Sequence, residues 1–209
     1  MSTRYLGQTV DIHAGGADLC FPHHDCEIAQ VEPLQEGEPF VRFWMHTAMV
    51  HHEGEKMSKS LGNLVMVSDL LKSFSPDALR LYLGRHHYRS TWSHSQKELE
   101  RAEELAGRLR RAVQAKGGES QPLDPAGAWA SFTTSMDDDL DTTAAQNLVE
   151  RLADSITEAA MGGRQVVKAQ VALRTMAQIF GLRLGADGPE ASVLNRWNRH
   201  LERFQASLS

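Results

Sequence analysis

The sequence predicts a mostly helical protein in which a small α/β region precedes an α-helical bundle. Two stretches with β character, residues 9–14 and 40–50, flank a helical stretch at residues 23–31. From residue 96 onward, apolar residues recur at steps of three and four, which is typical of amphipathic helices. Nine of the ten histidines also lie before residue 95. We therefore predict two parts with different roles, residues 1–95 and residues 96–209.

The first part is predicted to contain a strand, a helix and a second strand. TVDIHA, residues 9–14, alternates apolar and polar residues, as a half-buried strand does, and runs into Gly15 and Gly16, where the backbone must turn or be approached closely. A helix follows Pro22 over residues 23–31. The aromatic stretch FVRFWMHTAMV, residues 40–50, favours a strand in its second half.

Two helix starts are predicted before the bundle. Ser68 is expected to cap a short helix, DLLKSF. Ser75, Pro76 and Asp77 combine a capping residue, a proline at the first helical position and an acid in the first turn. The helix DALRLYLG is expected to follow them.

Four amphipathic helices joined by loops predict an antiparallel bundle in the second part. The first three end near Gly117, Gly162 and Gly181, and residues 117–127 form a loop. The apolar stripes are Leu99, Ala102, Ala106, Leu109 and Val113; Ala145, Leu148, Leu152, Ile156 and Ala159; Val166, Ala169, Leu173, Met176 and Phe180; and Leu194, Trp197, Leu201 and Phe204.

Composition narrows the classes of function. The net charge of −5 means that the whole surface does not attract nucleic acid, so an RNA contact would need a local basic patch. No window holds the roughly 18 apolar residues of a membrane span, and the first residues lack a signal pattern. We therefore expect a cytoplasmic protein without membrane contact, in which Cys20 and Cys26 are reduced thiols.

The stretch EKMSKSLGN, residues 55–63, places Lys56 and Lys59 three residues apart in a turn rich in small residues. Two ammonium groups on such a turn can converge on a polyphosphate and stabilise the charge that builds up during nucleotidyl transfer. Ser58 adds a hydroxyl donor, and Gly62 adds backbone freedom. The alternative is a solvated basic turn.

The stretch HAGGADLCFPHHDCE, residues 13–27, holds a second group of candidates. Its glycines allow a ligand to approach closely, and Asp18 can accept from a ribose hydroxyl or an amino group. His23 and Glu27 are four residues apart on a predicted helix, so they share a face and suit one metal ion, with Cys26 near the same face. The alternatives are a chance surface pair and cysteines that pack as small apolar residues.

Two basic clusters are candidate RNA contacts. Arg108, Arg110 and Arg111 lie in the last turns of the first long helix with no acid among them. Arg85 and Arg89 flank two histidines and a tyrosine. Either cluster can meet phosphates. For the helix, the alternative is a solvated last turn that the helix dipole favours.

These stretches together carry a family resemblance. HAGGADLCFPHHDCEIAQ, FWMHTAMV, EKMSKSLGN and SPDALRLYLGRHHYRS, in this order and spacing, resemble the second half of a bacterial cysteinyl-tRNA synthetase. The likeness is close over residues 3–95 and looser over residues 136–152. KMSKS alone marks class I aminoacyl-tRNA synthetases, whereas the GG-x-D-L-x-FPHH-x-x-E string indicates the cysteine member. The resemblance implies the KMSKS half of a Rossmann catalytic domain, followed by a DALR-type helical bundle that lies along tRNA.

The resemblance also implies an activity and residue roles in protein biosynthesis. The family uses ATP with magnesium to activate cysteine, joins it to tRNA(Cys), and grips the cysteine thiolate with zinc held by two cysteines, a histidine and a glutamate. The implied catalytic residues are Lys56, Ser58 and Lys59. The implied ATP and adenylate residues are Gly16, Ala17, Asp18, His46 and Lys59. The implied metal ligands are His23 and Glu27, with Cys26 as a possible substitute. The implied RNA contacts are Arg85, Arg89, Arg108, Arg110 and Arg111.

The departures from the family pattern matter as much. No H-x-G-H occurs in the chain, and on this resemblance the half with that ATP-binding signature and both zinc cysteines would precede Met1. We therefore expect a chain that is impaired or inactive alone. Two alternatives stay open: a non-catalytic paralogue that binds RNA, nucleotide or a protein partner, and a relative of the ligases that join cysteine to an amino sugar.

A sheet that lacks the half it would pack against exposes an edge or an apolar face, and this exposed part should be covered in another way. We expect two or three strands with helices packed over them, or a homodimer or protein partner that covers the truncated face.

Overall fold

The computed structural model describes residues 2–35, 37–58 and 60–185, which form two compact units. The first unit comprises residues up to Val65 together with His86–Ser95. The second comprises residues 66–85 together with the residues from Gln96 onward. The predicted order, a small α/β region with parallel strands and then a helical bundle, is confirmed. The division differs from a single boundary at residue 95, because residues 66–85 group with the bundle.

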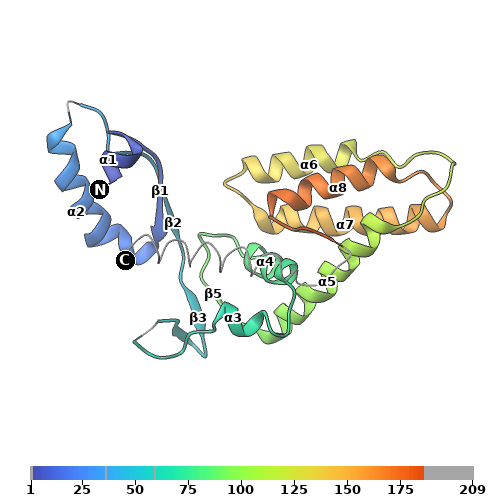
Figure 1. Ribbon diagram of the computed structural model, residues 1–209, viewed down its shortest axis with the longest axis horizontal. Helices are drawn as coiled ribbons and strands as arrows, with labels where there is room; N and C mark the ends of the chain where they lie inside the picture. The colour runs from blue at the N-terminus through green and yellow to red at the C-terminus, as the bar shows by residue number, and fades with distance from the viewer. Residues whose placement is uncertain (1, 36, 59, 186–209) are drawn as a thin grey trace, which may run out of the picture. The chain divides into compact units, whose positions relative to one another are not determined.

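The first unit is built on two parallel strands joined by a helical crossover (Figure 1). After the short helix α1 (Ser2–Leu6), strand β1 (Val10–Gly16) pairs with β2 (Val41–Thr47). The crossover consists of the helical turns η1 (Ala17–Leu19) and η2 (Cys20–His24), helix α2 (Asp25–Val31) and the turn η3 (Glu32–Leu34). The predicted strand at 9–14 and helix at 23–31 are thus confirmed.

The second predicted strand lies earlier than expected. The prediction places it in the second half of residues 40–50, whereas β2 starts at Val41. Val10 of β1 lies opposite Val41, and Gly16 lies opposite Thr47, so pairing with the seven residues of β1 determines the extent of β2. The next residues form β3 (Val50–His52), which begins a separate small sheet.

This small sheet holds the start of the KMSKS stretch. Strand β3 lies between β4 (Glu55–Lys56), which is antiparallel to it, and β5 (Trp92–Ser93), which is parallel. Lys56 pairs with His51 across the β3–β4 turn, and Glu53 and Gly54 adopt positive φ there. The backbone therefore holds the first lysine at a strand end next to a tight turn.

The helices of the first unit cover only one face of the parallel sheet within the described residues. Alternating positions of β1 and β2 point to opposite faces. On one face, His13, Trp44 and His46 are half-buried against the crossover, whereas on the other face Ile12 and Phe43 are opposite each other and 63% and 69% exposed. That helices, a homodimer or a protein partner cover the face that bears Ile12 and Phe43 stays a prediction.

The second unit is an α-helical assembly in which α5, α7 and α8 pack on one another, with α4 against α5 and α6 against α7 (Figure 1). Its helices are α3 (Val67–Leu70), α4 (Pro76–Gly84), α5 (Gln96–Gln114), α6 (Ala126–Asp137), α7 (Thr142–Met161) and α8 (Val167–Ile179). Three of the four predicted helices correspond to α5, α7 and α8. The fourth, with Leu194, Trp197, Leu201 and Phe204, lies outside the described residues.

The predicted apolar stripes form most of the helical core. The whole first stripe is buried along α5, and in α7 only Leu148 is half-buried, because Val149 takes the core position beside it. Helix α6 was not predicted. Phe132 is its one fully buried residue, so α6 shows no apolar stripe. The hydroxyl groups of Thr133, Thr134 and Ser135 donate to carbonyl oxygens four residues earlier in the helix.

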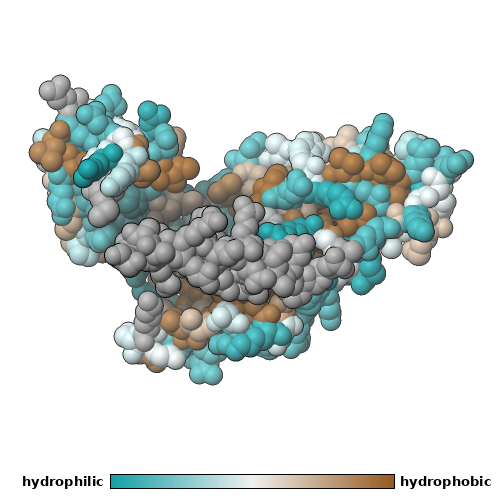
Figure 2. Space-filling view, viewed as in Figure 1, coloured by the Kyte–Doolittle hydropathy of each residue, from teal (hydrophilic) through white to brown (hydrophobic). Residues whose placement is uncertain are grey.

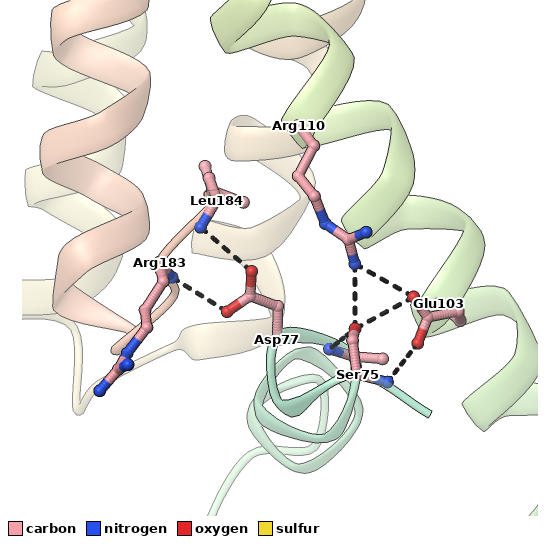
Figure 3. Close-up of polar contacts among 7 residues, drawn as sticks. Ser75, Asp77, Glu103, Arg110, Arg183 and Leu184 are labelled. Atoms are coloured by element: carbon pink, nitrogen blue, oxygen red, sulfur yellow. Dashed lines mark hydrogen bonds and ion pairs between the residues drawn. The ribbon is translucent and has the colours of Figure 1, made fainter. Parts of the chain in front are cut away.

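Helix α4 starts as predicted and is fixed by polar contacts at its N-terminus (Figure 3). Ser75 Oγ accepts from Ala78 N at 3.2 Å, and the carboxylate of Glu103 on α5 accepts from Ser75 N at 2.6 Å and Ser75 Oγ at 3.0 Å. The cap therefore also joins α4 to α5. The cap predicted at Ser68 is wrong, since Leu70 N already donates to Met66 O and the helix starts one residue before Ser68.

Asp77 joins α4 to the segment that follows α8. Its two carboxylate oxygens accept from the backbone N–H groups of Arg183 at 2.9 Å and Leu184 at 3.1 Å (Figure 3). Asp77 is buried, so both oxygens are satisfied by these amides away from water. Asp77, predicted as an acid in the first turn of the helix, therefore also links α4 to the backbone of Arg183 and Leu184.

Apolar side chains remain on the surface of the helical unit. Figure 2 shows them over α6 and α8, where Trp129, Val167 and Val171 are exposed.

Among the described residues, no helix combines the length and the apolar character that crossing a membrane requires.

Candidate functional site

An ion pair links the KMSKS stretch to the glycine-rich end of β1. Lys56 Nζ lies 2.7 Å from Asp18 Oδ2, although the two residues are 38 positions apart. The hydrogen bond from Lys56 lowers the pKa of Asp18 below its ordinary value. Both side chains are about half exposed, so a ligand can reach either partner. Two stretches that the sequence singled out separately are therefore parts of one site.

Gly16 lies directly beside this contact. A Cβ at Gly16 would lie 2.5 Å from Asp18 Oδ1 and 2.8 Å from Met49 Cε, so any larger residue would shift the ends of these two side chains. Gly16 ends β1, and Ala17 and Asp18 follow in the turn η1, so the backbone reverses directly at the pair. The predicted nucleotide residues Gly16, Ala17 and Asp18 thus lie together, next to Lys56.

The loop after Lys56 is held by an asparagine that sequence reasoning does not single out. Asn63 Oδ1 accepts from Ser58 N at 2.9 Å, and Asn63 Nδ2 donates to Lys56 O at 3.2 Å. Ser58 Oγ and Ser60 Oγ lie 3.1 Å apart. Asn63 therefore closes the loop between the lysine and the serines. Lys59, the second predicted lysine, lies outside the described residues.

Aromatic rings cluster on the covered face of the parallel sheet. His24 is only 3% exposed, and its Nδ1 lies 2.7 Å from Nε2 of His46. The rings of Trp44 and His46 are parallel, with centroids 6.2 Å apart. Burial, and then the imidazoles of His13 and His46, lower the pKa of His24 below its ordinary value. His46 therefore takes part in a cluster in which the neutral imidazole of His24 is favoured.

The predicted metal ligands His23 and Glu27 lie close together, and His13 and His24 lie beside Glu27. His23 Nε2 lies 3.5 Å from Glu27 Oε1, and His13 Nε2 lies 3.4 Å from Glu27 Oε2. His13, His24 and Glu27 each place a ligand atom within 4.8 Å of the others. Cys26 is an exposed free thiol. Sequence reasoning missed His13 and His24, because only folding brings β1 against the crossover helix.

The predicted RNA-contacting arginines differ in their surroundings. Arg108 binds Glu150 at 2.7 Å and Asp154, and the hydrogen bond to Asp154 is the main cause of its raised pKa. Arg110 donates to Ser75 Oγ at 3.0 Å and Glu103 Oε1 at 3.1 Å (Figure 3).

The other three predicted RNA contacts lie elsewhere on the surface. Arg85, at the end of α4, is exposed, and Arg89 lies over the Tyr88 ring at 4.9 Å. Arg111 lies on α5 beside a surface pocket of about 560 Å³. The acids that neutralise Arg108 and Arg110 come from neighbouring turns and helices, so the local sequence around the arginines did not show them.

Comparisons with known proteins agree with the motifs. The family described as tRNA synthetases class I (C) catalytic domain matches residues 1–104. A cysteine–tRNA ligase of Dehalococcoides mccartyi is 38% identical over 88% of this chain and 41% of its own length. One from Streptomyces avermitilis is 41% identical over 87% of this chain and 40% of its own length. The chain thus spans about 40% of the length of these relatives.

A solved structure supports the fold. The chain resembles a LeuRS from Agrobacterium radiobacter, solved in a ternary complex with tRNA and LeuAMS, with a TM-score of 0.60 at 17% identity. The likeness covers 81% of this chain and 25% of that one. Together with the linked GGAD and KMSKS stretches, these matches show that the chain belongs to the cysteine–tRNA ligase family and carries part of a class I synthetase catalytic domain.

Proposed function

We propose that this chain supplies the KMSKS part of a cytoplasmic site that uses ATP with magnesium to activate cysteine and join it to tRNA(Cys). The observation that carries the proposal is the contact between Lys56 and Asp18, which unites the two motifs of the family resemblance. In this proposal Gly16, Ala17, Asp18 and His46 line the adenylate pocket. Lys56, Ser58 and Lys59 act on the phosphates.

The chemistry assigned to Lys56 follows from its position. Its charge is matched by Asp18, and both groups are accessible. When a triphosphate enters, the ammonium group exchanges part of this contact for phosphate oxygens. There it stabilises the negative charge that grows as the cysteine carboxylate attacks the α-phosphate and pyrophosphate leaves. Asp18 then accepts from a ribose hydroxyl or from the amino group of the substrate.

Zinc suits the donor set near Glu27. The buried Glu27 Oε2 has no hydrogen-bond partner in the described part of the chain, and imidazoles lie beside it. The family resemblance assigns His23 and Glu27 as ligands, with Cys26 as a substitute. Bound zinc would supply a soft Lewis acid that prefers a thiolate to a hydroxyl, which favours cysteine over serine.

For RNA, we propose that Arg85, Arg89 and Arg111 make the contacts with phosphate. Arg108 and Arg110 would join them only by leaving carboxylates that they already bind. Breaking such pairs costs free energy, so their contribution is expected to be smaller. A gel shift with tRNA tests this ranking: Arg85→Ala and Arg111→Ala should weaken the shift more than Arg110→Ala.

We further propose that the chain completes the reaction only with additional protein. A two-stranded parallel sheet is too small for a nucleotide cleft of the Rossmann type, which needs both halves of the sheet. The test is pyrophosphate exchange that depends on cysteine and ATP, measured with the chain alone and with an added N-terminal half of the Dehalococcoides mccartyi relative. We expect no exchange alone and exchange with the added half, which Lys56→Ala should abolish.

Several outcomes would count against this function. Exchange by the chain alone at the rate of an intact relative would contradict the need for additional protein. A lack of exchange in every mixture, combined with a tRNA shift that weakens with salt, would favour the non-catalytic alternative. The exposed Ile12 and Phe43 are the observation behind that alternative, since they suit a protein partner or a homodimer. Consumption of cysteine with an amino sugar instead of tRNA would favour the sugar ligase.

A further inference from the structure

We propose that a pocket inside the helical unit binds a small zwitterion of the free α-amino acid class. The pocket has a volume of about 300 Å³ and lies where α4, α5 and α7 pack together. All of its lining residues belong to the helical unit. Pockets for small molecules begin at roughly this size, which favours a ligand with few heavy atoms. The floor of the pocket consists of four buried residues, Leu81, Ala102, Leu105 and Gln146.

The amide of Gln146 in this floor lacks a donor. Gln146 is only 1% exposed, and its Oε1 has no hydrogen-bond partner in the described part of the chain. Its Nε2 donates to Leu81 O at 3.0 Å. Because a carbonyl oxygen can only accept, this bond fixes the orientation of the amide and leaves Oε1 as the end that needs a donor. A buried acceptor without a donor costs free energy, and an N–H group of a bound ligand would remove that cost.

Charged side chains of both signs surround the floor. Arg108 already binds Glu150 at 2.7 Å and also binds Asp154. The other two arginines of the lining, Arg85 and Arg101, are exposed at its rim. In total the pocket is lined by three arginines and three glutamates, Arg85, Arg101, Arg108, Glu98, Glu104 and Glu150. Equal numbers of both charges favour a ligand with one charge of each sign over a polyanion such as a nucleotide.

A free amino acid matches these groups in one orientation. Its ammonium group would donate to Gln146 Oε1 at the floor and to the exposed carboxylate of Glu104. Its carboxylate would accept from the guanidinium groups of Arg85 and Arg101. Its side chain would lie against the apolar part of the floor. This inference goes beyond the proposed function and does not depend on the ligase activity.

Binding of free amino acids to the full-length chain tests the proposal. Each proteinogenic L-amino acid is added at millimolar concentration, without ATP or tRNA, and methyl NMR follows the signals of Leu81 and Leu105. We expect at least one amino acid to shift these signals. Acetylation of its amino group, or conversion of its carboxylate to an amide, should weaken binding at least about tenfold, because each change removes one charge-assisted hydrogen bond.

Substitutions in the pocket identify the groups that bind. Arg101→Gln and Gln146→Leu should each lower the affinity at least about tenfold. The matched control is Arg151→Gln, since Arg151 is an exposed arginine of α7 that is not part of the pocket lining, and it should leave the affinity unchanged. Circular dichroism checks that each variant is folded. Arg101 is exposed, so Arg101→Gln still decides the question if Gln146→Leu does not fold.

Three results would overturn the proposal. The first is that no amino acid shifts the methyl signals. The second is binding that Arg101→Gln leaves intact, including binding of cysteine at the residues of the proposed function. The third is a tRNA gel shift that Arg101→Gln weakens while no amino acid binds, which would assign the arginine to RNA. None of these measurements detects pyrophosphate exchange, so failure of the proposed function would leave them unaffected.

Discussion

At the scale of single residues, the contact between Lys56 and Asp18 explains why the chain carries a lysine and an aspartate 38 positions apart in two separate motifs. Each residue alone is an ordinary exposed charge. In the pair, Asp18 holds the ammonium group of Lys56 next to the turn that follows Gly16 at the end of β1. The pair is exposed and therefore weak, so under the proposed function a nucleotide phosphate competes with Asp18 for the Lys56 ammonium group.

The titration of Asp18 tests the pair directly. Lys56 lowers the pKa of Asp18, mainly by hydrogen bonding to its ionised form. The pair with Lys56 therefore stabilises the folded state above the ordinary pKa of an aspartate. This stabilisation is lost as the pH falls through the lowered pKa of Asp18. In Lys56→Ala, carbon NMR of the Asp18 carboxyl group should show the midpoint rising toward the ordinary value. Lys72→Ala, which breaks the exposed pair with Asp69, should leave the Asp18 midpoint unchanged.

The residue-level predictions from local chemistry succeeded at Ser75 and failed at Ser68, where the helix starts one residue earlier. Ser75 caps its helix because the cap needs only the next three residues. The sequence could not show that Asn63 closes the KMSKS loop, or that His13 reaches Glu27, because both contacts depend on the fold of segments between them.

At the scale of elements, Asp77 is the connection between α4 and the end of the helical unit. In Asp77→Asn, the one remaining acceptor oxygen cannot serve the amides of both Arg183 and Leu184. Leaving a buried donor unsatisfied costs about 1–3 kcal/mol, so urea denaturation should show stability lowered by that amount.

The control for Asp77 is another aspartate in the same unit. The Asp69 carboxylate is exposed and, among the residues that the structure describes, pairs with Lys72 three positions later. Asp69→Asn should therefore change stability by less than about 0.5 kcal/mol. If Asp77→Asn and Asp69→Asn lowered the free energy of unfolding equally, the contacts of Asp77 with Arg183 and Leu184 would contribute nothing to stability.

Helix α8 offers a matched pair for the core. Leu173 is fully buried, whereas Val171, two positions earlier, is 59% exposed. Leu173→Ala should lower the free energy of unfolding by about 2–5 kcal/mol through lost burial and a cavity. Val171→Ala should cost far less, because the exposed methyl groups leave little packed volume. Chemical denaturation followed by circular dichroism at the helix band measures both.

The elements themselves were predictable to the extent that their apolar residues were periodic. Helices α5, α7 and α8 bury the stripes that the sequence predicts, except for the half-buried Leu148 and Phe180, because a helix that buries one face must repeat apolar residues. Helix α6 has no such stripe and is anchored mainly by Phe132, so periodicity could not reveal it. The extent of β2 was misjudged because a strand ends where its partner ends, and the partner lies in another segment.

At the scale of the whole molecule, the uncovered sheet face is the main departure from an ordinary parallel sheet. Parallel sheets are normally buried on both faces, yet Ile12 and Phe43 are more than 60% exposed. The double substitution Ile12→Ser and Phe43→Ser should therefore reduce binding of the fluorescent probe ANS and lower self-association. Analytical ultracentrifugation at several concentrations measures the latter. Unchanged dye binding and association would show that this face is not what the probe or a second copy contacts.

The class of the fold followed from the sequence, whereas the grouping of its parts did not. The order of strands and helices predicted an α/β region and a bundle, and both are present. The assignment of residues 66–85 to the helical unit depends on buried contacts that α4 makes with α5 and α7. No boundary signal in the sequence marks such contacts.

This interleaved path means that the two units cannot be separated by a single cut. The chain passes from one unit to the other after Val65, after Arg85 and again after Ser95. A shortened chain that stopped at residue 95 would keep α4 but strip away the helices that shelter Ala78, Leu81 and Tyr82, and those side chains would then face water. Gene trimming at the apparent motif boundary would thus yield an aggregation-prone piece, and each unit must be dissected by replacing residues in place.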